Sequence, residues 1–437
     1  MTERVYLHVG APKSGTTYLQ TVLDSNRAVL EGAGTLLVGR HLDRIHAAMA
    51  VREDPRLAEL PESAGGAWRR LVGEIKGWSG SSALLSYELF AVASAEQAAR
   101  ALADLAAYDV HVVVTARDLG RSVVSAWQER LKFGLTTPLE EWQPKPESAE
   151  RSEWGWRTLD PSGVAERWGA TLPADHVHVV TAPRPDAGPS ELWRRFADAC
   201  GLAELDVLLD VPRANESVGV VQAELLRRVN GLLQGQISGS RQRSVWIRDL
   251  LAQEVLAPLG SERIGVPEAR AAEATEVWRR AGERIEAQGY VVHGDLADLR
   301  PAPSDARLPG QVTEAELTEA AVACISSLVL TMRERGARAR SSSTPGPKPA
   351  AGSPPAGRRR GRMRELAARA TGPYNNLRVH QLTRRIEELE REVQQARRLH
   401  LRVATLQDVV TELLLEPDDR DDGVTTQALR RYRKESL

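Results

Sequence analysis

One stretch near the start of the chain, residues 5–23 (VYLHVGAPKSGTTYLQTVL), restricts the fold more than any other. Its first residues, Val5–Val9, form a short apolar run of the kind that becomes a buried strand. Gly10 breaks the run, and apolar residues return at helical spacing from Leu19 onward. A strand, a tight loop and a helix start together direct backbone N–H groups and a helix dipole toward an anion. Because Lys13 adds a full positive charge to the loop, the stretch predicts an anion-binding site.

The loop differs in one respect from a Walker A loop, which requires Gly, four residues, and then Gly-Lys-Ser/Thr. Gly10 and Gly15 have that separation, but the lysine stands inside the loop, at position 13. The run Pro-Lys-Ser-Gly-Thr-Thr at residues 12–17, followed by the aromatic Tyr18, resembles the 5′-phosphosulfate loop of the sulfotransferase superfamily. Those enzymes use 3′-phosphoadenosine 5′-phosphosulfate (PAPS). The alternative is a chance glycine-rich turn between a strand and a helix.

A second motif follows the β-branched run Val110–Thr115, which predicts a strand. A Walker-type NTPase would carry a Mg²⁺-binding Asp at the tip of this strand, whereas this chain has Arg117. Ser125 comes eight positions later, and the pair resembles the 3′-phosphate motif of sulfotransferases. Arginine offers a planar fork that matches a phosphate, and serine adds a neutral donor. The alternative is an arginine exposed to solvent at a helix start.

The resemblance implies roles for the loop residues during transfer. Lys13, the loop N–H groups and the hydroxyls of Thr16 and Thr17 would stabilise charge on the leaving 5′-phosphate. The complete set that it implies for binding PAPS is Lys13, Ser14, Gly15, Thr16, Thr17, Tyr18, Arg117 and Ser125. A further basic loop of the form Arg-Lys-Gly, usual in the family, is not found, and Arg241 and Arg243 are the best substitutes.

The acceptor hydroxyl needs a general base, and three residues qualify. Glu88 comes at the end of the apolar run 83–86, and open α/β sheets bind ligands outside the carboxyl ends of their strands. Its alternative role is that of an ordinary glutamate favoured by a helix dipole. His8 on the first strand is second, with strand packing as its alternative, and His46 is third. The predicted catalytic residues are therefore Lys13, Glu88 and His8.

Composition bears on partners and compartment. The formal net charge of −1 gives no general basic bias toward nucleic acid. Cys200 and Cys324, the two cysteines, form neither a disulfide framework nor a metal cluster, and we expect no metal. The first residues lack the basic-then-apolar pattern of a signal peptide, and the apolar run at Leu328–Leu330 is too short to span a bilayer. These features predict a cytoplasmic protein without a membrane span.

Strands and helices alternate along most of the chain. Short apolar runs predict strands, and longer segments of helical periodicity lie between them. The expected fold class is α/β, with a P-loop-like, mostly parallel sheet flanked by helices and a C-terminal helical or coiled-coil extension. The strands are expected within residues 5–9, 32–38, 83–86, 110–115 and 177–181.

The expected organisation has five parts. They are a sulfotransferase-like α/β domain (1–301), an amphipathic helix (312–340), a disordered Pro/Ser/Arg linker (341–362), a coiled-coil-like helix (363–416) and a mobile tail (417–437). A heptad seam runs from Leu382 to Leu413 with one three-residue phase slip. It predicts a homo-oligomer through this helix, and the alternative is a helix folded back onto the main domain.

Three functions are consistent with these features. The first is a sulfotransferase that moves a sulfuryl group from PAPS to a hydroxyl or amine of a carbohydrate, glycolipid or small natural product. Tryptophans between residues 131 and 168 offer faces for such an acceptor, or else pack in the interior. The second is an ATP-dependent P-loop kinase, disfavoured by the displaced lysine and by Arg117. The third is a non-catalytic nucleotide-binding scaffold that acts through its coiled coil, disfavoured by the intact Lys13, Arg117 and Ser125.

Overall fold

The computed structural model describes residues 2–184, 187–188, 190–211 and 217–341, with side chains to residue 335. All of them belong to one compact unit, Met1–Thr344, and Pro345–Leu437 form a second unit. The predicted linker from residue 342 onward, the coiled coil, the tail and the homo-oligomer therefore fall outside the described residues.

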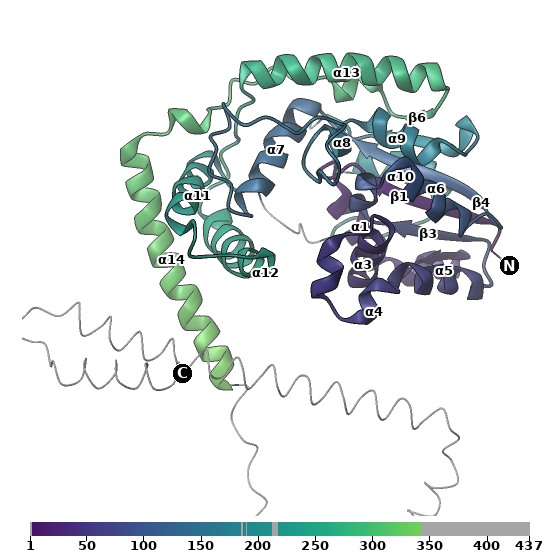
Figure 1. The fold of residues 1–437 in the computed structure, drawn as a ribbon, viewed down its shortest axis with the longest axis horizontal. Coiled ribbons are helices and arrows are strands. Elements are labelled where there is room, and N and C mark those ends of the chain that lie inside the picture. Colours follow the sequence, from purple (N-terminus) through teal and green to yellow (C-terminus); the bar gives the residue numbers. More distant parts are fainter. Residues whose placement is uncertain (1, 185–186, 189, 212–216, 342–437) are drawn as a thin grey trace, which may run out of the picture. The chain divides into compact units, whose positions relative to one another are not determined.

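The centre of the first unit is a sheet of six strands, all paired in parallel (Figure 1). The strands lie in the order β2-β3-β1-β4-β5-β6. Five coincide with the runs expected from sequence, and the short β6 closes one edge. Their bounds are β1 Arg4–Gly10, β2 Thr35–Leu37, β3 Ser82–Ser86, β4 Asp109–Ala116, β5 Val177–Thr181 and β6 Val291–His293. The α/β class with a parallel sheet flanked by helices is confirmed.

The helices fall into three groups. One sheet face carries α3 (His41–Val51), α5 (Ala67–Gly77), α6 (Ala95–Ala103) and α9 (Pro161–Gly169), and the other carries α1 (Thr16–Ser25), α2 (Arg27–Gly32) and α10 (Ser190–Ala199). The third group comprises α7 (Leu119–Leu131), α8 (Trp156–Leu159), α11 (Val220–Leu233), η5 (Arg243–Leu256), α13 (Glu268–Gln288) and α14 (Glu314–Ser341). Short helical turns include η1 Pro55–Glu59, α4 Glu62–Gly65, η2 Glu88–Val92, η3 Ala174–His176, α12 Ser240–Gln242, η6 Ala257–Leu259, η7 Leu296–Leu299 and η8 Pro309–Gln311.

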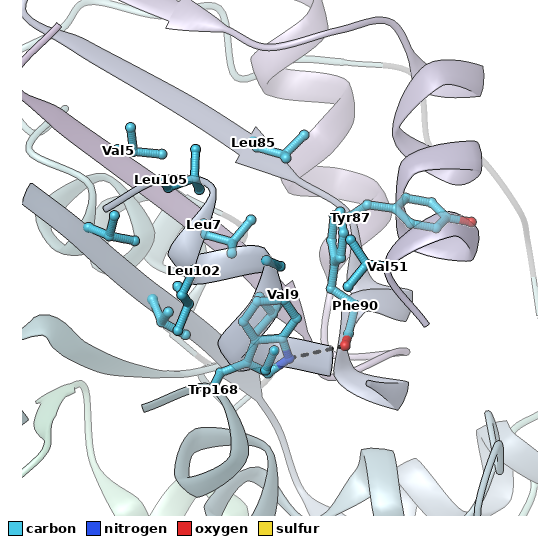
Figure 2. Close-up of a cluster of buried hydrophobic side chains, with 14 of the residues drawn as sticks. Val5, Leu7, Val9, Val51, Leu85, Tyr87, Phe90, Leu102, Leu105 and Trp168 are labelled. Atoms are coloured by element: carbon cyan, nitrogen blue, oxygen red, sulfur yellow. Dashed lines mark hydrogen bonds between the residues drawn. The ribbon is translucent and has the colours of Figure 1, made fainter. Parts of the chain in front are cut away.

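Alternation along β1 divides the sheet into two packed faces. Val5, Leu7 and Val9 point into the cluster with α3, α5, α6 and α9 (Figure 2). Tyr6 points the opposite way, into the cluster with α1 and α10. In the first cluster the fully buried Trp168 donates its indole N–H to the carbonyl of Phe90 at 3.1 Å. Trp168 therefore packs in the core, which excludes it from the stacking faces considered for an acceptor.

Strand order places a topological switch point at the end of β1. The chain leaves β1 toward β2 and β3 on one side of the sheet, and leaves β4 toward β5 and β6 on the other. Helices connecting strands in opposite directions leave a crevice outside the carboxyl ends of the two neighbouring strands. The loop after β1 and the start of α7 after β4, which carry the two sequence motifs, both open onto this crevice.

The last described helix, α14, belongs to the same unit as the sheet. Leu317 and Ala320 are buried against the cluster that includes α11, so the fold continues past the boundary expected at residue 301. Within Glu314–Arg335 the mean hydropathy is 1.4 and 6% of that window is buried. By length and composition alone this helix can cross a membrane, although the run at Leu328–Leu330 cannot. Core helices of soluble proteins can have the same length and composition, but they are mostly buried.

A buried chain of hydrogen bonds joins the three central strands. His8 Nδ1 lies 2.8 Å from the hydroxyl of Ser86 on β3, and His8 Nε2 lies 3.1 Å from the hydroxyl of Thr115 on β4. The Ser14 hydroxyl lies 2.6 Å from that of Thr115 and donates to the carbonyl of Ala11 at 2.5 Å. All four side chains are buried, and burial lowers the pKa of His8 to about 3.

The low pKa of His8 predicts a pH-dependent stability. The unfolded chain takes up a proton below about pH 6.5, whereas the folded chain keeps His8 neutral until about pH 3. The contribution of neutral His8 to the free energy of unfolding is therefore present above about pH 6.5 and is lost as the pH falls toward 3. Between pH 7.5 and 5.5 the free energy of unfolding should fall by roughly 1.4 kcal/mol more in the wild type than in His8→Gln.

Urea denaturation at the two pH values measures this difference. His41→Gln, which changes an exposed histidine on α3, is the matched control and should keep the wild-type pH dependence. An unchanged pH dependence in His8→Gln would show that His8 is not held neutral.

Candidate functional site

The loop between β1 and α1 has a backbone that only certain residues can adopt. Lys13 and Gly15 both have positive φ, at 66° and 92°. A Cβ on Gly15 would lie 2.4 Å from a methyl of Leu192, so a larger residue is excluded by contact as well as by conformation. Gly15 is the N-cap of α1, and no side chain caps the helix. The first N–H groups of α1 are therefore available to a ligand.

Ser14 and Thr16 hold the loop in this shape. Both are buried, and the Ser14 hydroxyl is bonded to Ala11 within the loop and to Thr115 on β4. The structure thus brings the loop residues predicted from sequence together at the switch point. It gives the Ser14 side chain a structural partner on β4 that the sequence does not indicate.

A pocket of about 910 Å³ opens on one side of the loop. Ser14, Gly15 and Tyr18 line it from the loop and the start of α1, and Arg117 lines it from the end of β4. Further arginines converge on the same pocket from three other segments: Arg121 on α7, Arg184 after β5 and Arg263 before α13. The concentration of guanidinium groups beside a helix N-terminus suits a ligand with several negative charges.

Arg117 and Ser125 meet as their spacing predicted. The Arg117 guanidinium donates to the Ser125 hydroxyl at 2.5 Å and to the carbonyl of Arg121 at 3.0 Å. Its Nε is buried and has no hydrogen-bond partner among the described residues. Burial, with a smaller effect from the charge of Arg121, lowers the pKa of Arg117 to about 10. A buried N–H without a partner is costly on a guanidinium whose hydrogen-bond partners within the described residues are neutral, and a bound anion would remove that cost.

The extra basic residue at this pocket is not the one expected from sequence. Arg241 and Arg243 do not line it, and Arg243 lies instead near Gly134, where an added Cβ would be 3.7 Å from its Nε. Arg263 lines the pocket, within the run Arg263-Ile264-Gly265. This run differs at one position from the Arg-Lys-Gly form, and a pattern that allows one substitution matches it.

A second pocket, of about 730 Å³, lies on the other side of α1. Thr17 and Gln20 line it from α1, and Glu88 lines it from the end of β3. The Glu88 carboxylate accepts a hydrogen bond from the Gln20 side chain at 2.8 Å, which fixes its position. The first turn of α1 therefore separates the arginine-rich pocket from the pocket that contains Glu88.

Lys13 is held by an ion triad that the sequence does not reveal. Its Nζ lies 2.9 Å from Glu129 Oε1, and Lys132 Nζ lies 2.8 Å from the same oxygen. Burial alone would raise the pKa of Glu129, but the charges of Lys13 and Lys132 outweigh it and lower the value to about 2. Both Glu129 and Lys132 line the pocket that contains Glu88. The amphipathic pattern of α7 gave no signal for this triad, because its partner lies 116 residues away.

Neither His8 nor His46, the histidines predicted as general bases, lines the two pockets. His8 is fully buried, both of its ring nitrogens are hydrogen-bonded within the sheet, and it lines neither pocket described above. Its prediction as a catalytic residue is therefore wrong, and packing within the strands was the correct alternative. His46 also lines neither pocket, whereas His41, on the same helix, lines the pocket that contains Glu88.

One group with the composition of a metal site lies at the opposite end of the sheet. Asp109, His111 and His176 bring one ligand atom each within 4.8 Å of one another. Asp109 begins β4, whereas the loop of Lys13 follows the carboxyl end of β1. Asp109 also accepts a hydrogen bond from Arg4 at 2.8 Å, and His176 Nδ1 lies 3.1 Å from the carbonyl of Val110. These residues are thus separate from the two pockets.

Known proteins are similar to parts of the chain. A family model described as a domain of unknown function (DUF6752) matches residues 382–436. No curated protein matches. The crystal structure of a sulfotransferase from Alicyclobacillus acidocaldarius is similar at 15% identity, with 57% of this chain and 98% of that chain covered and a TM-score of 0.35. A sulfotransferase domain from the curacin biosynthetic pathway is similar at 13% identity, with 67% and 99% covered and a TM-score of 0.29.

The ion triad predicts a specific loss of stability. Glu129→Gln removes the one carboxylate that pairs with Lys132 among the described residues, and the Lys132 side chain is 5% exposed. An unpaired buried ammonium should lower the free energy of unfolding by about 3 kcal/mol. Glu276→Gln, which breaks an exposed ion pair on α13, is the matched control and should leave the same quantity nearly unchanged. Equal effects of the two variants in chemical denaturation would contradict the triad's role.

Proposed function

We propose that this protein is a sulfotransferase that transfers the sulfuryl group of PAPS to a hydroxyl or amine of an acceptor. The observation that carries the proposal is Arg117. Its half-buried guanidinium is bonded to Ser125, its buried Nε has no partner among the described residues, and it lines the same pocket as the uncapped start of α1. Two anion-binding groups in one pocket suit a nucleotide with phosphates at both its 3′ and 5′ positions.

In this proposal the donor pocket has two ends. Arg117 and Ser125, with Arg263 nearby, would hold the 3′-phosphate. The loop Ser14–Thr17 would hold the 5′-phosphosulfate through its N–H groups, and Tyr18, which lines the pocket, would contact the adenine. PAPS supplies an activated sulfate ester when it is bound, so the residues have only to place it and to stabilise the leaving phosphate.

The acceptor would enter from the pocket that contains Glu88. The Glu88 carboxylate, held by Gln20, would take the proton of the attacking hydroxyl. Lys13 extends from the loop to Glu129, which lines this pocket, and forms an ion pair with it. On binding the donor it would exchange that carboxylate for the charge that develops on the 5′-phosphate.

A kinase is disfavoured by Asp118, the carboxylate next to the tip of β4. Its Oδ1 accepts from the backbone N–H of Arg121 at 3.0 Å, and its Oδ2 accepts from that of Ala302 at 2.9 Å. Both oxygens are thus committed to capping α7 and fixing the segment after η7. A Mg²⁺ ligand at this strand tip would need at least one of them.

Nucleotide binding provides the first test. The wild type should bind 3′-phosphoadenosine 5′-phosphate at least about tenfold more tightly than AMP, because only the former reaches Arg117. Arg117→Ala should abolish this preference, and Lys13→Ala should weaken the binding of both nucleotides. Calorimetry with each nucleotide, and with ATP and Mg²⁺, measures these affinities. Equal or tighter binding of ATP would support the kinase, and no binding of any nucleotide would contradict the sulfotransferase, the kinase and the nucleotide-binding scaffold alike.

The role of Glu88 is tested by turnover. Glu88→Gln keeps the side-chain shape but removes the base, so release of 3′-phosphoadenosine 5′-phosphate from PAPS with an acceptor should slow roughly 100-fold. Affinity for 3′-phosphoadenosine 5′-phosphate should stay unchanged, because Glu88 lines the other pocket. Glu276→Gln on α13 is the control for turnover. An unaffected rate in Glu88→Gln would assign proton removal to another group.

A further inference from the structure

A third pocket, of about 870 Å³, lies outside the two already described. It is lined by the C-terminal end of α3, the segment from η2 to the start of α6, the end of α7 and the region of residues 142–157. Neither sequence motif contributes to it. Its lining contains many charged side chains and two tryptophans, which suits a polar ligand rather than an apolar one.

This pocket lies beside the one that contains Glu88. Three elements contribute residues to both pockets. The turn η2 contributes Glu88 to one and Val92 to the other, and α7 contributes Glu129 to one and Arg130 to the other. Helix α3 lines the Glu88 pocket from its start, and Arg52, its C-cap, lines the third pocket. A molecule longer than one pocket would therefore extend from Glu88 into the third pocket.

Arg52 marks an anion-binding position in the third pocket. Its side chain is 5% exposed, and Nη2 lies 2.6 Å from Asp54 Oδ2 and 2.7 Å from Glu153 Oε1. Its Nε and Nη1 are buried without a hydrogen-bond partner among the described residues. Two unsatisfied donors on a buried cation are costly, and an anionic oxygen entering the pocket would satisfy them.

The charges around Arg52 do not cancel. Asp54 and Glu153 are shared by Arg52 and Arg56, and Glu53 is paired with Arg100. Of the other charged residues of the lining, Arg130, Lys145, Arg151 and Arg157 are cations, and Glu96 and Glu150 are the carboxylates that oppose them. The pocket therefore presents a net positive surface around a buried, incompletely bonded arginine.

Two tryptophans add flat faces and donors. Trp142 is buried at the pocket wall and Trp154 is half-buried there. Neither indole N–H has a hydrogen-bond partner in the described part of the chain, and neither nitrogen belongs to the buried unsatisfied atoms. Both can therefore donate to a ligand. A sugar ring offers an apolar face for the indole ring and oxygens for its N–H.

We propose that the third pocket binds the acidic units of an anionic carbohydrate acceptor, whose reacting hydroxyl lies at Glu88 in the neighbouring pocket. This inference rests on the proposed function for its meaning, but the binding site is defined by residues outside the donor pocket. It narrows the acceptor class to carbohydrate chains that carry negatively charged groups. Arg130, Arg151 and Arg52 recognise the charge, and Trp142 and Trp154 contact the rings.

Binding to the full chain tests the site without turnover. The probes are a hyaluronan hexasaccharide, which carries carboxylates and no sulfate, and maltohexaose, which is neutral. We expect the acidic hexasaccharide to bind, with an affinity that falls as salt is raised, and maltohexaose to bind at least about tenfold more weakly. Hexaglutamate, an acidic peptide without sugar rings, should also bind more weakly because it cannot use the tryptophans.

Charge reversal locates the binding. Arg130→Glu and Arg151→Glu change exposed side chains and should each weaken the acidic hexasaccharide about tenfold, as expected for loss of a charge-assisted contact. Arg69→Glu makes the same change on the exposed surface of α5 and should leave the affinity within about twofold. Trp154→Ala should weaken the hexasaccharide but not hexaglutamate. Equal loss in Arg69→Glu would overturn the site, because it would reduce the effect to overall charge.

The donor nucleotide separates the two hypotheses. If 3′-phosphoadenosine 5′-phosphate binds but the acidic hexasaccharide does not, this inference is wrong and the proposed function stands. If the hexasaccharide binds through Arg130 and Arg151 while the nucleotide does not, the carbohydrate site stands and the proposed function fails. Equal binding of maltohexaose overturns the acidic class, and tighter binding of hexaglutamate replaces the carbohydrate with an acidic peptide.

Discussion

The buried hydrogen-bond chain from Ser86 through His8 and Thr115 to Ser14 is the interaction on which the site depends. It ties β3, β1 and β4 together and ends in the loop after β1. A loop with positive φ at Lys13 and Gly15 is not stable by itself, and it keeps its shape because Ser14 is fixed to the sheet. Polar groups this deeply buried are costly unless every one is paired. This set of hydrogen bonds therefore specifies one arrangement of strands and loop.

The cations around the loop are held in different ways, and the difference has chemical consequences. Lys13 has a carboxylate partner in Glu129, so its charge is compensated before any ligand arrives. Arg117 has only neutral partners and an unsatisfied Nε, so it is already desolvated and gains most from an anion. In the proposed function the first cation must change partner, whereas the second needs only to receive one. This contrast makes Arg117 the stronger indicator of a phosphate site.

The first turn of α1 lies between two of the pockets. Gly15 and Tyr18 line the arginine-rich pocket, and Thr17 and Gln20 line the Glu88 pocket. In the proposed function, the arginine-rich pocket would hold the donor and the Glu88 pocket the acceptor, on the two sides of this helix start. In the further inference, the third pocket would extend the acceptor side along α3, η2 and α7.

The sequence by itself determined five of the six strands, the parallel α/β class, the loop at residues 12–17 and the meeting of Arg117 with Ser125. These features are local, or follow from periodicity and from an ordered strand-to-helix turn. Tertiary structure alone decided which charged and aromatic side chains meet. It buried His8 and Trp168, paired Lys13 with Glu129, and brought Arg263 rather than Arg241 or Arg243 to the pocket. Such contacts join distant segments, 78 residues apart for Trp168 and Phe90 and 116 for Lys13 and Glu129. Burial and pairing depend on how helices pack on the sheet, which sequence spacing does not encode.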